Sequence, residues 1–90
     1  MNAETDDQLL TRVRTGDRDA FESLVRRHLK AAYRMALSHT GDRAEADRVC
    51  RDAFLAALRR IEACPDPNRF RPWLLDIVRR RVGEIRGSGE

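Results

Sequence analysis

The chain has 90 residues, of which 41% are hydrophobic and 37% are charged, so it has material for one small core beneath a densely charged surface. No apolar run approaches the ~20 residues of a membrane-spanning helix, and the acidic amino terminus is unlike a secretory signal, so we expect a cytoplasmic protein without membrane insertion. The net charge of +3 comes from residues 46–90, whose ten basic and seven acidic side chains are typical of a polyanion-binding surface or of a solvated helix face.

A short helix is predicted at the amino end of the chain. It begins near Thr5 or Asp6, because Thr5 and Gln8 have the spacing of a capping box. Gly16 is a typical helix-ending residue and is expected to stop this helix. The apolar stripe of the helix consists of Leu9, Leu10 and Val13.

A second, longer helix follows, with Asp17 or Asp19 as its cap and Gly41 at its end. Apolar residues recur along it at helical spacing. They are Phe21, Leu24, Val25, His28, Leu29, Ala32, Met35 and Ala36. His28 falls on this stripe, where we expect a hydrogen-bonded core histidine rather than a catalytic base.

The third helix starts after Asp42, which repeats the capping-box spacing with Glu45. Its buried stripe is predicted to comprise Ala46, Val49, Cys50, Ala53, Phe54, Ala57, Leu58 and Ile61. The opposite face carries Arg48, Arg51, Asp52, Leu55 and Arg59. Cys50 is therefore expected to be a core thiol.

Residues 62–71 are predicted to form a joint without a helix, because Pro65 and Pro67 lie close together in it. Pro72 suits the first position of a fourth helix. The stripe of that helix is Trp73, Leu74, Ile77, Val78, Val82 and Ile85. The sequence thus predicts an all-α domain over residues 1–86, a compact bundle of three long helices and a short leading one, with residues 87–90 as a linker or tail.

Catalysis and metal binding have little support in the sequence. The chain lacks the short motifs of metalloproteases, serine hydrolases and phosphate-binding loops. Cys50 and Cys64 are the only cysteines, and together with His28 and His39 they do not have zinc-ligand spacing. We therefore expect no catalytic activity, no metal and no cofactor. A free thiol at Cys64, in the joint, again favours a reducing cytoplasm.

Four groups of residues occur in an order and spacing typical of one family. They are Asp7-x-Leu9-Leu10-x-x-Val13-x-x-Gly16-Asp17-x-x-Ala20-Phe21-x-x-Leu24-Val25-x-x-His28, then Thr40-Gly41-Asp42-x-Ala44-Glu45-Ala46-Asp47, then Asp52-Ala53-Phe54-Leu55, and Arg69-Phe70-Arg71-Pro72-Trp73-Leu74-Leu75-x-Ile77. Together they resemble region 2 of extracytoplasmic-function sigma factors, the small alternative specificity subunits of bacterial RNA polymerase. The resemblance runs through nearly the whole chain and implies a compact helical bundle.

The resemblance also implies partners and sites. It implies binding to core RNA polymerase, at the clamp helices of the largest subunit, and to the non-template strand of the promoter −10 element as it opens. An anti-sigma factor is a further implied partner. The positions that match the polymerase-binding face are Asp47, Arg48, Arg51, Asp52 and Leu55. Those predicted to contact DNA are Asn68, Arg69, Phe70, Arg71, Arg79, Arg80 and Arg86.

The residues of the joint and last helix have chemistry that suits single-stranded DNA, and plainer interpretations as well. Arginine forks bind phosphates, and Asn68 can both donate and accept a hydrogen bond at a base edge. Phe70, in contrast, is open to two interpretations, a hydrophobic staple onto Leu75 or a platform for a base. Asp76 and Arg80 have the spacing of a surface ion pair.

Two other side chains of the last helix are expected to face the core. Trp73 lies on the apolar stripe and is expected to be a core anchor. Arg81 is expected to lie toward the bundle with its stem buried.

The chain also departs from the family pattern. Arg48 and Arg51 stand where members commonly carry an acidic residue and glutamine, Leu58 replaces an aromatic residue, and Arg80 replaces an asparagine. Like charges at an interface are costly, so Arg48 and Arg51 favour a second hypothesis. In it, the chain is a sigma-like module that binds an anti-sigma factor or another regulator without polymerase function. A helical scaffold that binds nucleic acid without sequence preference is a third.

Overall fold

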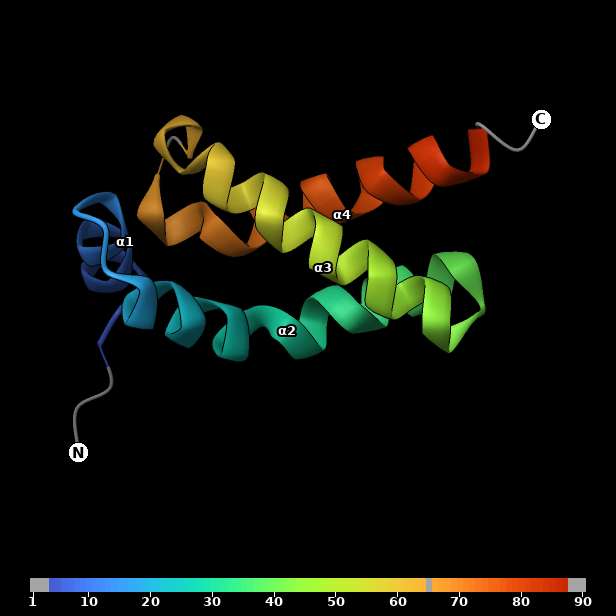
Figure 1. The fold of residues 1–90 in the computed structure, drawn as a ribbon, viewed down its shortest axis with the longest axis horizontal. Coiled ribbons are helices and arrows are strands. Elements are labelled where there is room, and N and C mark those ends of the chain that lie inside the picture. The colour runs from blue at the N-terminus through green and yellow to red at the C-terminus, as the bar shows by residue number, and fades with distance from the viewer. Residues whose placement is uncertain (1–3, 65, 88–90) are drawn as a thin grey trace.

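Four α-helices and two 3-10 turns make up residues 4–64 and 66–87, which are the residues described by the computed structural model. In chain order these elements are α1 (Asp6–Arg14), α2 (Arg18–Thr40), α3 (Arg43–Arg59), η1 (Ile61–Ala63), η2 (Pro67–Arg69) and α4 (Phe70–Gly87). The three long helices α2, α3 and α4 pack against one another, and α1 lies against α2 and both 3-10 turns (Figure 1). The predicted all-α bundle with a short leading helix is confirmed.

Side-chain caps start the first three helices. Thr5 and Gln8 form the predicted capping box, with the Gln8 N–H donating to the Thr5 hydroxyl at 3.1 Å and the Thr5 N–H donating to the Gln8 amide oxygen at 2.8 Å. Asp17, and not Asp19, caps α2. Asp42 caps α3 by accepting two backbone N–H groups at its first turn.

Glycine makes both sharp turns of the first half of the chain. Gly16 and Gly41 have φ angles of 96° and 68°, in the left-handed region that other residues rarely adopt. The Gly41 N–H donates to the Leu37 carbonyl at 2.8 Å, which closes the end of α2. The two turns reverse the chain and bring α1 and α3 onto α2.

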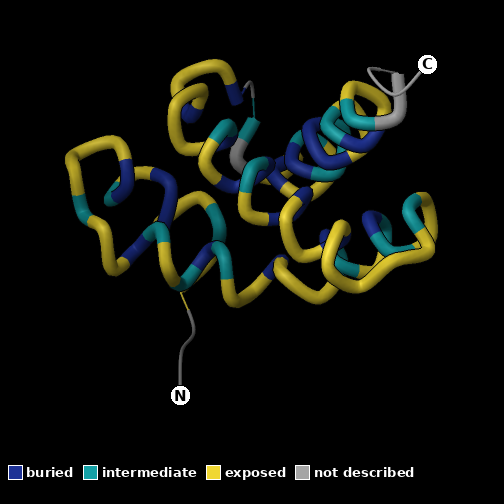
Figure 2. Tube along the Cα trace, turned by 45° about the vertical axis from the view of Figure 1, so that its right-hand side comes forward, coloured by how far each residue is buried: buried dark blue, intermediate teal, exposed yellow. Residues whose placement is uncertain are grey.

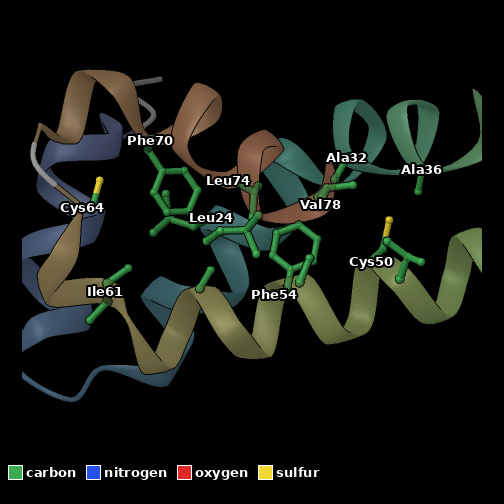
Figure 3. Packing of buried hydrophobic residues seen from close by; sticks show 14 of the residues in the cluster. Leu24, Ala32, Ala36, Cys50, Phe54, Ile61, Cys64, Phe70, Leu74 and Val78 are labelled. Atoms are coloured by element: carbon green, nitrogen blue, oxygen red, sulfur yellow. The ribbon is translucent and has the colours of Figure 1, made fainter. Parts of the chain in front are cut away.

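The core lies between the three long helices (Figure 2). Leu24 of α2, Phe54 of α3 and Leu74 of α4 meet near its centre (Figure 3). Beyond them, α2 contributes the small side chains of Ala32 and Ala36, both fully buried. Small residues let helix backbones approach closely, so this end of the bundle packs with little side-chain volume.

Two leucines that were predicted to lie on buried stripes are exposed instead. Leu29 of α2 is 43% exposed and Leu58 of α3 is 39% exposed. A helix at the edge of a small bundle is covered over only part of its circumference, and both leucines lie at the margin of that covered face. Periodicity marks the stripe, but it does not give the stripe's width.

The joint and the last helix also differ from the prediction. α4 begins at Phe70 rather than at Pro72. Pro72 is tolerated within the first turn because a proline there removes an N–H that has no partner within the helix anyway. Cys64 lies in the joint, as predicted, but its thiol is not at the surface, because the residue is 3% exposed and belongs to the core. α4 runs to Gly87, one residue past the predicted domain boundary, while Pro65 and residues 88–90 lie outside the described residues.

Candidate functional site

The outer face of α3 presents charged and apolar side chains to solvent. Asp47, Arg48 and Arg51 are exposed, and Leu55 is 53% exposed. A guanidinium nitrogen of Arg51 lies 3.4 Å from a carboxylate oxygen of Asp47, one helical turn away. Such an exposed pair contributes little stability, so these side chains are free to reorganise around a partner.

A hollow of about 460 Å³ lies between α2 and α3 beside this face. Asp47, Arg51 and Leu55 line it from α3. The lining from α2 includes Phe21, Val25 and Leu29. Three of the five predicted polymerase-binding residues therefore border one apolar hollow.

A second hollow, of about 420 Å³, continues from the first, because Phe21 lines both. Leu58 borders this second hollow. We call five large apolar residues along the two hollows, each exposed or half-buried, the apolar seam. They are Phe21, Val25, Leu29, Leu55 and Leu58.

Leu29 and Leu58 fit the periodicity of buried residues, so their place in the seam does not follow from the sequence. One feature of the sequence hints at their exposure. Each leucine lies at the edge of the apolar stripe of its helix, and each stripe has more apolar positions than the neighbouring helices can bury.

Asp52 lies on the other side of α3, facing α4. Its carboxylate accepts a hydrogen bond from Arg81 at 3.1 Å, and Arg81 also donates to Glu84 at 3.0 Å. The predicted inward position of Arg81 is thus confirmed, and its Nε is buried without a partner among the described residues. Asp52 therefore joins α3 to α4 and lines neither of the two hollows.

The joint presents Asn68 and Arg69 at the surface, and Arg71 follows in the first turn of α4. The Asn68 N–H donates to the Asp66 carboxylate at 2.9 Å, which fixes η2 and leaves the Asn68 amide exposed. Phe70 differs from its neighbours because its side chain is fully buried.

Burial removes Phe70 from the predicted DNA-contacting set. Its ring centroid lies 5.1 Å from that of His28 and 5.9 Å from that of Trp73, so it packs on these rings and anchors the start of α4. A buried ring has no face for a base to stack on. Trp73 is half-buried against the core, as expected.

His28 is 4% exposed and has polar partners from two other helices. Its Nε2 lies 2.8 Å from the Asp6 carboxylate, and its Nδ1 accepts from the Arg71 Nε at 3.2 Å. Asp6 also pairs with Arg27 at 2.9 Å. Burial lowers the pKa of His28 from 6.5, although Asp6 opposes this shift, so the neutral imidazole is favoured. The expected hydrogen-bonded core histidine is confirmed.

Exposed arginines continue along α4. Arg79 and Arg80 lie 2.5 Å and 2.9 Å from the two carboxylate oxygens of Asp76, which confirms the expected Asp76–Arg80 pair. Because two guanidinium groups share one carboxylate, this stretch keeps a positive charge. The Arg86 side chain lies outside the described residues, so its predicted DNA contact remains a prediction.

Both cysteines are buried thiols. Burial raises the pKa of Cys50 to about 11 and raises the pKa of Cys64 as well. Within residues 4–64 and 66–87, no group of three or more His, Cys, Asp or Glu side chains is placed to hold a metal ion. In the same part of the chain, no helix is both long enough and apolar enough to cross a membrane.

Residues 24–84 match the family model described as sigma-70 region 2. Among curated proteins, the chain is 32% identical over 81 residues to RNA polymerase sigma factor NccH of Alcaligenes xylosoxydans xylosoxydans, a match covering 90% of this chain and 44% of that protein. It is 33% identical over 78 residues to ECF RNA polymerase sigma factor BldN of Streptomyces coelicolor, covering 86% of this chain and 30% of that protein.

A third relative is RNA polymerase sigma-H factor of Pseudomonas aeruginosa, 31% identical over 78 residues, which covers 87% of this chain and 40% of that protein. In all three matches the chain spans less than half of the relative's length. The likeness therefore concerns only part of each relative.

Proposed function

This chain belongs to the sigma-70 region 2 family, in its extracytoplasmic-function branch, and we propose that it binds core RNA polymerase with one surface and the opened −10 strand with another. Its role is that of a sigma factor domain in transcription initiation. In this proposal the domain acts by binding alone and catalyses no reaction. The observation that carries it is the separation of an apolar seam, between α2 and α3, from the exposed arginines of the joint and α4.

The seam and the outer face of α3 support the proposed contact with polymerase. Leu29, Leu55 and Leu58 are the large hydrophobic side chains that are exposed in the described residues, and all three belong to the seam. Protein-binding surfaces combine an apolar centre with a charged rim, and Arg48 with the Asp47–Arg51 pair provides such a rim. We therefore place the clamp helices of the largest subunit along the seam.

The joint and α4 support the proposed contact with DNA. Arg69 and Arg71 are exposed beside Asn68, and no ion pair involves either arginine in the part of the chain that the structure describes. Single-stranded DNA is held by cations along its backbone and by polar groups at its base edges. The described geometry offers both, with α4 extending the cationic path to Arg79 and Arg80.

Binding of the chain to bacterial core RNA polymerase tests the docking surface. We expect Leu55→Asp to weaken binding about tenfold or more, because a carboxylate at the centre of an apolar contact must lose its water. Arg34→Asp is the matched control, since Arg34 is exposed on α2 and lines neither hollow of the seam. Equal affinities of wild type and Leu55→Asp would contradict docking on the seam.

Arg48 and Arg51 support a second candidate function, binding of an anti-sigma factor or another regulator without polymerase function. Both side chains are exposed where a clamp helix would approach, and each differs in charge from the common family residue. If the wild type does not bind polymerase and the double variant Arg48→Asp, Arg51→Gln does, this second function is the correct one. Binding by the wild type excludes it.

A further inference from the structure

Arg71 is held by residues from two other helices, and the proposed DNA contacts do not explain their arrangement. Arg71, at the start of α4, donates from Nε to Nδ1 of His28 in α2. His28 in turn lies 2.8 Å from Asp6, the first residue of α1. Asp6 is fixed by its second oxygen, which accepts from Arg27 at 2.9 Å. These contacts form one chain of hydrogen bonds from α1 through α2 to α4.

The donors and acceptors of this chain require one form of His28. Because Arg71 can only donate, Nδ1 of His28 must be without a proton and must accept. The Nε2 nitrogen then carries the proton and donates to Asp6. The ring is also held by packing against Phe70, whose centroid is 5.1 Å away.

We propose that His28 is a positioning residue for promoter binding, whose neutral ring holds the Arg71 guanidinium in place beside the joint, with Asp6 fixing the ring. Fixing an arginine side chain in one conformation costs conformational entropy. A hydrogen bond at Nε fixes most of the Arg71 side chain before DNA binds, so less entropy is lost on binding. It leaves the four N–H groups on the two terminal nitrogens for a phosphate or a base. The inference rests on the proposed DNA contact of the joint and α4.

The decisive experiment is a double-variant cycle, measured as binding of a fluorescent single-stranded −10 oligonucleotide to the chain on core polymerase. In the wild type we expect Arg71→Ala to cost about tenfold in affinity, as for one charged hydrogen bond. In the His28→Gln background we expect Arg71→Ala to cost much less, because Arg71 is no longer held. An equal cost in both backgrounds would overturn the proposal.

Two controls separate this proposal from the proposed function. Arg69 is an exposed neighbour with no bond to His28 in the described residues, so Arg69→Ala should cost the same with and without His28→Gln. His28→Asn keeps an acceptor near the Nδ1 position and should retain most of the Arg71 contribution. If neither Arg69→Ala nor Arg71→Ala weakens binding, the DNA surface itself is wrong.

A spectroscopic measurement tests whether His28 holds Arg71 in the absence of DNA. In the free chain, the Arg71 Nε–H should exchange slowly with water when His28 is neutral. The groups facing this ring are Asp6, Arg27 and Arg71, and two of them are cations. As the pH falls below 6.5 toward the lowered pKa of His28, protonation at Nδ1 should release Arg71 and lower the protection of its Nε–H, measured as its exchange rate relative to that of an unbonded arginine at the same pH. The same exchange rate in wild type and His28→Gln would contradict the proposal.

Discussion

At the scale of single residues, neighbours in the chain have separate tasks at the joint. Asn68 and Arg69 are exposed, whereas Phe70 is fully buried between His28 and Trp73. The aromatic ring therefore fixes where α4 starts, and the polar side chains around it meet solvent. Mutations at adjacent positions should consequently affect different properties, stability in one case and DNA recognition in the other.

Phe70→Ala is expected to lower the free energy of unfolding by about 3–5 kcal/mol, because it removes a buried ring and leaves a cavity. Phe70→Leu refills part of that cavity and should cost less. Urea unfolding followed by circular dichroism measures both. Weaker DNA binding by Phe70→Ala at unchanged stability would instead show that the ring contacts DNA.

Asn68→Ala is expected to change the preference among −10 sequences more than the overall affinity, since an amide can read a base edge and the Asn68 side chain is exposed. The backbone N–H of Asn68 still donates to Asp66 in the variant, so η2 should persist. Binding to a panel of single-stranded −10 variants measures the effect. The same loss on every sequence would make Asn68 a structural turn residue.

At the scale of the helices, the caps of α1 and α3 and most stripe positions were predictable from the sequence because they depend on local chemistry. Thr5 with Gln8 and the acidic cap Asp42 define helix starts by hydrogen bonds within a few residues. The contact of His28 with Asp6 joins residues 22 positions apart, and no local pattern signals it.

The exposed seam leucines were not predictable for a related reason. Leu29 and Leu58 fit the periodicity of buried residues, and only the packing of α2 on α3 shows that they lie at an uncovered edge. The exposure of the candidate DNA-contacting arginines was easier to predict, because long charged side chains are rarely buried, while their contacts with DNA remain predictions. Phe70 is buried instead, and its exposure was not predictable, since an aromatic residue between two prolines suits the core and the surface equally.

Helix α4 should contribute to DNA affinity through charge. Neutralising Arg79 and Arg80 to Gln is expected to flatten the dependence of log affinity on log salt concentration by roughly 0.7 for each lost phosphate contact. Asp76→Asn should strengthen binding, because it frees both guanidinium groups from their shared carboxylate. Titrations of a single-stranded −10 oligonucleotide at several salt concentrations measure both. An unchanged slope in the arginine variant would remove α4 from the DNA surface.

At the scale of the whole molecule, the bundle keeps two binding surfaces at fixed positions. The apolar seam lies between α2 and α3, whereas Arg79 borders a hollow between α2 and α4. The core that joins these surfaces is shared, with Leu24, Phe54 and Leu74 at its centre (Figure 3). A rigid core of this kind holds the DNA surface in a set orientation once the seam is bound to polymerase.

The most direct test of this account is selection of single-stranded DNA by the chain bound to bacterial core RNA polymerase. The probe is a pool of short single strands of randomised sequence, recovered with the complex and sequenced. We predict that one motif is enriched, that its complement is not, and that Asn68→Ala alters the motif while Leu55→Asp abolishes recovery. Recovery that is independent of polymerase and shows no enriched motif would contradict the proposed function.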